Sequence, residues 1–149
     1  ILYIIRELID FKAESRRTDI RLGLEYLTKV MKRRCTAFVI SDFYTRKDFS
    51  QELRIANKKH DVVAIQVYDP RAKEMPDVGL MKVVDAETGH EMYIDTHDAR
   101  LRKVHNKYWE EREIRLHEML SQSHVDSVAI ATDDDYVKML MTLFSKRNR

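Results

Sequence analysis

The hydrophobic pattern is most compact in short apolar runs, at residues 35–41, 62–68 and 127–131. The first is rich in β-branched and aromatic residues and ends in a carboxylate, Asp42. Short runs bounded by polar residues are typical of strands buried on both faces of a parallel sheet. A helical pattern separates the first two runs, which predicts parallel neighbours joined by a right-handed crossover.

Apolar positions at helical spacing predict the remaining layers of the fold. Helices are expected over residues 1–13, 19–33, 47–59 and 97–121, with a last helix after residue 135. The first is expected to turn one apolar face inward. Thr18 is the expected N-cap of the second, in which close packing against the sheet would explain Gly23. Alternation over residues 80–84 and 91–94 predicts a β-hairpin. The sequence therefore predicts a three-layer α/β domain, with a mostly parallel sheet, helices on both faces and an added hairpin.

Composition narrows the function classes. The chain has 149 residues, which suits one domain, and its formal net charge of +2 gives no electrostatic case for nucleic acid. No apolar run is long enough to cross a membrane. The three glycines are too few to build a phosphate-cradling loop. The one cysteine, Cys35, is expected to be a buried, inert thiol in a reducing compartment, which favours the cytoplasm.

Candidate chemistry lies where the predicted strands end. Asp42, Asp69 and Asp133 follow the three strands, and parallel strands place their carboxyl ends on one rim, where ligands bind in open α/β sheets. Carboxylate oxygens are the ligands that Mg²⁺ prefers. Alternatively, each aspartate only starts a turn or caps a helix. That explanation is weakest for Asp42, because Asp48 or Ser50 could cap the helix that follows it.

Short motifs occur in order along nearly the whole chain. They are Arg17-Thr18-Asp19-Ile20, Lys32-Arg33-Arg34, Ile40-Ser41-Asp42-Phe43, His60-Asp61-Val62-Val63-Ala64-Ile65, Asp69-Pro70-Arg71, Met75-Pro76-Asp77-Val78-Gly79-Leu80, Asp85-Ala86-Glu87-Thr88-Gly89, Ile94-Asp95-Thr96 and Thr132-Asp133-Asp134-Asp135-Tyr136. Together they resemble the bacterial family catalogued as domain of unknown function 58, which is similar to the von Willebrand factor type A fold. The resemblance implies that residues 1–149 form the C-terminal portion of one such domain, without its N-terminal strands. The chain also begins within a helical pattern, which predicts a fragment.

The resemblance also implies a metal site. Type A domains can hold a divalent cation at a metal-ion-dependent adhesion site, and Thr18 and Asp42 match two of its ligand positions. The Asp-x-Ser-x-Ser segment that supplies the others is absent from this chain. We therefore expect an incomplete site of low occupancy and no cofactor here, with magnesium in a longer parent protein.

Two function classes follow. The resemblance implies a non-enzymatic protein-interaction module that works with a MoxR-type AAA+ ATPase as an adaptor or assembly factor. The alternative is a magnesium-dependent phosphohydrolase that uses the acidic rim of Asp42, Asp69 and Asp133. If upstream strands are missing, the strand at 35–41 becomes an open sheet edge, which predicts a homo-oligomer formed by strand pairing.

Overall fold

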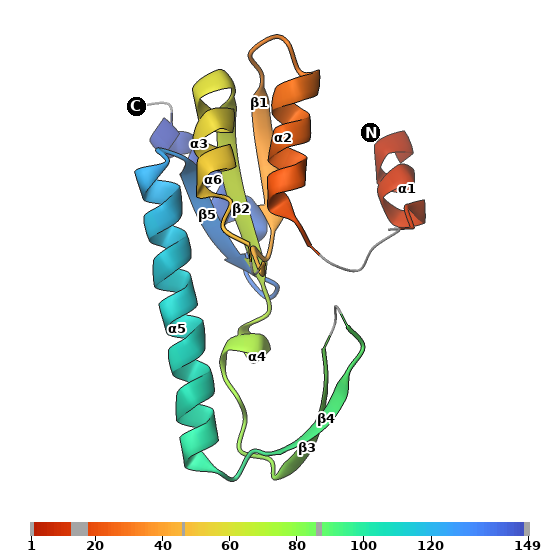
Figure 1. The fold of residues 1–149 in the computed structure, drawn as a ribbon, viewed down its shortest axis with the longest axis vertical. Helices are drawn as coiled ribbons and strands as arrows, with labels where there is room; N and C mark the ends of the chain where they lie inside the picture. The colour runs from red at the N-terminus through yellow and green to blue at the C-terminus, as the bar shows by residue number, and fades with distance from the viewer. Residues whose placement is uncertain (1, 13–17, 46, 86–87, 148–149) are drawn as a thin grey trace.

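The computed structural model describes residues 2–12, 18–45, 47–85 and 88–147. Helices and strands alternate through most of the chain, and Figure 1 labels them. The elements are α1 (Leu2–Asp10), α2 (Ile20–Val30), β1 (Thr36–Ser41), α3 (Ser50–Lys59), β2 (Asp61–Tyr68), α4 (Pro70–Lys73), β3 (Leu80–Val84), β4 (Glu91–Asp95), α5 (Ala99–Gln122), β5 (Asp126–Ala131) and α6 (Tyr136–Arg147).

The central sheet has the strand order β1-β2-β5, and both pairings are parallel. Val39 of β1 pairs with Ala64 of β2, which also pairs with Ser127 of β5. The helices α2 and α3 lie on one face and α6 on the other (Figure 1). These features confirm the predicted α/β fold with a parallel sheet between helical layers.

The main core fills the space between the sheet and the α2–α3 layer. Val62 and Ala64 of β2 point to this side, because residues two apart along a strand share a face. They belong to one buried cluster with residues of α2, α3, α5 and the segments beside these helices: Leu24, Phe43, Phe49, Leu53, Ala56, Leu116, Leu120 and Val125. The alternate residues of β2, Val63 and Ile65, are buried on the opposite face. Only β2 is therefore buried along both faces, as expected of the middle strand.

The prediction that β1 is buried on both faces is wrong. Phe38 and Ile40 are 47% and 65% exposed, although Phe38 meets Phe144 of α6 edge-to-face. The strand is the last in its sheet, so the single helix α6 cannot cover its whole outer face. In β5, likewise, only the last two residues, Ile130 and Ala131, are buried.

Several helix predictions also need correction. Asp19, not Thr18, is the N-cap of α2, because its carboxylate accepts a hydrogen bond from the Arg21 backbone N–H. The helix α3 begins at Ser50, where Asp48 accepts the backbone N–H. The helix α1 forms, but the apolar face expected to turn inward is exposed at Ile4, Ile5 and Ile9. In Figure 1, α1 lies apart from the sheet, which explains why no layer covers it.

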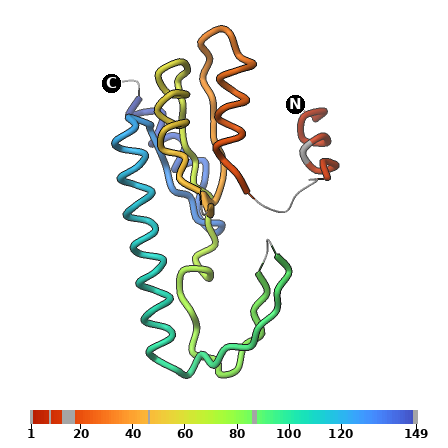
Figure 2. The backbone as a smooth tube through the Cα atoms, in the orientation of Figure 1, coloured from red at the N-terminus to blue at the C-terminus, as the bar shows by residue number. Residues whose placement is uncertain are grey.

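The hairpin β3–β4 forms the predicted insertion. Figure 2 traces the chain from β2 out to this hairpin and back along α5 to β5. Thr96 fixes the base of the hairpin: its buried hydroxyl donates to the Gly79 carbonyl at 2.7 Å and accepts from the Val78 N–H at 3.0 Å. Thr96 thereby joins the loop before β3 to the segment that leads into α5.

Candidate functional site

The three strand-end aspartates share one rim, as predicted, because their strands are parallel. The structure nevertheless divides them. Asp69 and Asp133 line one small pocket of about 200 Å³, and Asp42 is not among its lining residues. Asp69 also caps α4, where its carboxylate accepts from the Arg71 N–H at 2.9 Å. Its capping role was the alternative explanation considered from the sequence.

Asp42 sits at a strained turn. Its Oδ1 accepts the Tyr44 backbone N–H at 2.9 Å, and the Phe43 N–H donates to Ser41 Oγ at 3.0 Å. Phe43 between them has φ 54°, a left-handed conformation that is costly for a residue with a Cβ. Its ring is buried and stacked on Phe49, with the ring centroids 6.0 Å apart. Burial of this aromatic pair offsets the strain and holds the loop after β1 in a defined shape.

The other predicted metal ligand, Thr18, lies beside the same loop. Its carbonyl accepts from Thr45 Oγ1 at 3.5 Å, and next to it Lys47 Nζ lies 2.5 Å from Asp19 Oδ2. The start of α2 and the loop after β1 are thus joined at the rim. Within the described part of the chain, no group of three or more His, Cys, Asp or Glu side chains is placed to hold a metal ion.

Asp19 carries the strongest electrostatic perturbation at this junction. Hydrogen bonds from the Arg21 and Lys47 side chains hold the pKa of its carboxyl well below the ordinary range. The same pairing raises the pKa of Arg21. The ion pairs therefore keep Asp19 charged and fix the position of the α2 N-terminus against residue 47.

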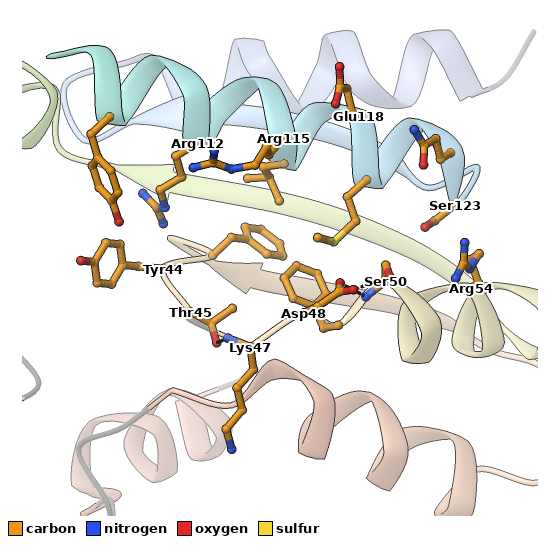
Figure 3. A pocket seen from close by; sticks show the side chains of 16 residues that line it. Tyr44, Thr45, Lys47, Asp48, Ser50, Arg54, Arg112, Arg115, Glu118 and Ser123 are labelled. Atoms are coloured by element: carbon orange, nitrogen blue, oxygen red, sulfur yellow. Dashed lines mark hydrogen bonds between the residues drawn. The ribbon is translucent and has the colours of Figure 1, made fainter. Parts of the chain in front are cut away.

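A larger pocket of about 630 Å³ opens beside this loop, between the residues after β1, the first half of α3 and the second half of α5 (Figure 3). Its apolar lining residues are Phe43, Phe49, Leu116 and Met119. Its charged lining residues are Lys47, Asp48, Arg54, Arg112, Arg115 and Glu118. Four cationic side chains line the pocket against two carboxylates, although Lys47 is already paired with Asp19. The lining therefore carries a net positive charge, which is complementary to an anionic group.

Arg112 anchors the pocket. Its guanidinium donates a hydrogen bond to the Asp42 carbonyl at 3.0 Å and lies 4.6 and 4.7 Å from the ring centroids of Tyr44 and Trp109. Burial lowers the pKa of Arg112, yet an arginine side chain remains charged in proteins. Sequence reasoning missed this residue. The available signal was the spacing on one helix, since Trp109 and Arg112 are three apart and share a face.

Two other charged residues of the pocket are held by local contacts. Asp48 accepts hydrogen bonds from the backbone and side chain of Ser50, which lower the pKa of its carboxyl. Arg115 lies 3.8 Å from Glu111 one helical turn away, a long and exposed ion pair. Since exposed pairs at this separation contribute little, the Arg115 guanidinium keeps much of its capacity to bind an incoming carboxylate.

The fold and its rim define an α/β domain with a parallel sheet and a basic pocket beside the loop that follows β1. Residues 1–115 match the family model described as "Protein of unknown function DUF58", and the chain belongs to this family. It is 29% identical over 133 residues to the uncharacterized protein MAV169 of Mycobacterium avium, covering 89% of this chain and 78% of that protein.

Other relatives are much longer than the region they share with this chain. The uncharacterized proteins Rv1480 of Mycobacterium tuberculosis and Mb1516 of Mycobacterium bovis are each 40% identical over 73 residues. That match covers 49% of this chain and 23% of either relative. No solved structure matches the chain significantly. Over the described ranges, none of the helices has the length and apolar character needed to cross a bilayer.

Proposed function

We propose that this domain is a non-enzymatic protein-interaction module whose pocket beside Asp42 binds an acidic segment of a protein partner. This proposal rests on one observation: three arginines, Arg54, Arg112 and Arg115, line the pocket together with its apolar residues. Guanidinium groups bind carboxylates through paired hydrogen bonds, and arginine and aromatic residues dominate the energetics of protein interfaces. A partner carboxylate flanked by an apolar side chain is complementary to this lining.

The partner that the family resemblance implies is a MoxR-type AAA+ ATPase, for which the domain would act as an adaptor or assembly factor. The pocket supports such a role because Arg112 is already oriented by Tyr44, Trp109 and the Asp42 carbonyl. An oriented side chain loses less conformational freedom on binding, which favours affinity. The pocket therefore needs little rearrangement to receive a partner.

A binding measurement tests this function. We would titrate a purified MoxR-type AAA+ ATPase from the source organism with the wild-type chain and with the double variant Arg54→Glu/Arg115→Glu. Both arginines are exposed, so their reversal should leave the fold intact. We expect affinity to fall about tenfold or more, because the variant repels a carboxylate. The matched control is Lys103→Glu, an exposed α5 residue outside the pocket. Equal losses in both variants, or no binding by the wild type, would contradict the proposal.

The phosphohydrolase alternative is favoured by one observation, the shared pocket of Asp69 and Asp133. Two-metal hydrolysis needs carboxylates that hold ions about 4 Å apart. A phosphatase screen with Mg²⁺ tests it. Turnover lost in Asp69→Asn and Asp133→Asn, but kept in Asp42→Asn, would assign hydrolysis to this smaller pocket. Turnover abolished by Asp42→Asn would overturn the adaptor proposal in favour of an enzyme that uses Asp42.

We also propose that a second copy of the chain pairs with β1. The strand lies at the edge of its sheet, and one face of it carries the exposed Phe38 and Ile40. An open edge presents unpaired N–H and C=O groups that recruit another strand. Two β1 strands related by a twofold axis would pair antiparallel and bring their apolar side chains together.

A further inference from the structure

The one cysteine of the chain is neither buried nor isolated. Cys35 is partly exposed and lines a groove of about 660 Å³ between α2 and β1. Its Sγ lies 3.4 Å from Nδ1 of His60, a hydrogen-bonding distance for sulfur. The expectation of a buried thiol is therefore wrong, because the edge position of β1 leaves one side of Cys35 open to the groove.

His60 is an unusual neighbour for a thiol. Its side chain is completely buried, at 0% exposure, and its Nε2 has no hydrogen-bond partner among the described residues. A neutral imidazole carries one N–H donor and one acceptor nitrogen. A buried N–H without a partner is rarer and more costly than an under-satisfied acceptor. The burial of Nε2 thus favours the tautomer whose proton is on Nδ1 and points at the cysteine sulfur.

We propose that Cys35 is a site of covalent modification by small disulfides, with His60 as its positioning residue. The Nδ1–H group donates to the sulfur, and this hydrogen bond is stronger when the sulfur is a thiolate, because bonds to charged acceptors are stronger. The thiolate is the nucleophile in disulfide exchange. A thiol held in this way and open to a groove is suited to attack.

The reaction balances without a further oxidant. Cys35 loses its proton to solvent, and its Sγ attacks one sulfur of the disulfide, forming a mixed disulfide with the protein. The S–S bond of the reagent breaks, and its other sulfur leaves with the electron pair as a thiolate, which takes up a proton. One small thiol is released for each protein modified. The adduct would occupy the α2–β1 groove and obstruct the edge at which we propose a second copy pairs.

The experiment measures modification of the native chain by oxidised glutathione at neutral pH, followed by intact mass. The urea-unfolded chain is the comparison, and N-acetylcysteine in each solvent corrects for the effect of urea. We expect the native thiol to react about fivefold or more faster than the unfolded one. Cys35→Ser should form no adduct. A native rate equal to or below the unfolded rate would overturn the proposal, and this comparison requires no variant to fold.

Variants of His60 test its role separately. His60→Phe should lose the rate advantage, whereas His60→Gln, which keeps an N–H donor, should retain most of it. The matched control, His117→Phe, changes an exposed histidine on α5 and should react like the wild type. Thermal unfolding of each variant identifies those that fold. An unchanged rate in folded His60→Phe would exclude His60 as the positioning residue.

Discussion

The guanidinium of Arg112 lies 3.0 Å from the carbonyl oxygen of Asp42, although the two residues are 70 positions apart in the chain. This hydrogen bond joins α5 to the loop that follows β1. Asp42, which the sequence indicated for its carboxylate, thus also uses its backbone carbonyl to hold Arg112, a lining residue of the larger pocket.

Replacement of Arg112 should weaken this junction. In Arg112→Lys the charge is kept, but a lysine cannot reproduce a planar guanidinium stacked on Tyr44 and Trp109. We expect the free energy of unfolding to fall by about 1–2 kcal/mol, measured by urea denaturation. Arg100→Lys, at an exposed position near the start of α5, should change it by less than about 0.5 kcal/mol. Equal effects would contradict the anchoring role.

Stability should fall in acid through Asp19. Because its pKa is lowered by Arg21 and Lys47, the folded state favours the charged carboxylate. This contribution is present above the ordinary carboxyl pKa of about 4 and is lost as the pH falls below it. The free energy of unfolding of Asp19→Asn should therefore decline less between pH 5 and pH 2 than that of the wild type. The control variant Glu110→Gln should decline as steeply as the wild type. An equally steep decline in Asp19→Asn would refute the assignment.

Magnesium should bind this chain only weakly. Thr18 and Asp42 offer one hydroxyl and one carboxylate, and Oδ1 of Asp42 already accepts the Tyr44 N–H. Mg²⁺ demands octahedral oxygen coordination and releases its water reluctantly. We expect titration calorimetry to show no specific site. In a parent chain with an intact Asp-x-Ser-x-Ser segment, Asp42→Ala should abolish binding and Thr18→Ala should weaken it less, because the hydroxyl is neutral. Equal affinity in the parent and its Asp42→Ala variant would end the metal hypothesis.

Self-association should depend on the outer face of β1. Light scattering should show dimers or larger species that increase with concentration. Ile40→Lys should shift the chain toward monomer, because a charge on an edge strand opposes pairing. The control Val104→Lys changes an equally exposed apolar residue on α5, at 67% against 65% exposure, and should leave association unchanged. A stable monomer at high wild-type concentration would count against the interface.

Two glycines should respond to alanine in opposite directions. Gly79 has φ +84°, and an added Cβ would lie 3.2 Å from His97 Nε2. Gly79→Ala should therefore destabilise the base of the hairpin by about 1 kcal/mol or more. A Cβ at Gly23 meets nothing within 4 Å. Gly23→Ala should accordingly raise helix stability by up to about 1 kcal/mol. Urea denaturation of both variants measures the contrast, and a loss of stability in Gly23→Ala would contradict it.

The open space around Gly23 also corrects an expectation from the sequence. Close packing of α2 on the sheet was expected to explain this glycine, yet the groove between α2 and β1 passes beside it. Helical periodicity identifies which residues share a face. It does not report how much of that face a neighbouring layer covers.

The sequence by itself determined the order and type of the main elements. The run at residues 62–65 is buried, and the two alternating runs that became β3 and β4 pair antiparallel. Such features are local, because side-chain period and turn chemistry act over a few residues. Among the elements that the structure describes, only the four-residue helix α4 was missed, since Asp69 and Pro70 start a helix too short to show periodicity.

Only the tertiary structure decided which surfaces and groups meet. The runs before Asp42 and Asp69 look alike in sequence, but β1 is an edge and β2 is central, because strand order depends on the packing of whole layers. The contacts of Arg112 with Asp42 and of Cys35 with His60 join residues 70 and 25 positions apart. No local pattern encodes such a pairing, since it arises from the register of the strands and from where each helix crosses the sheet.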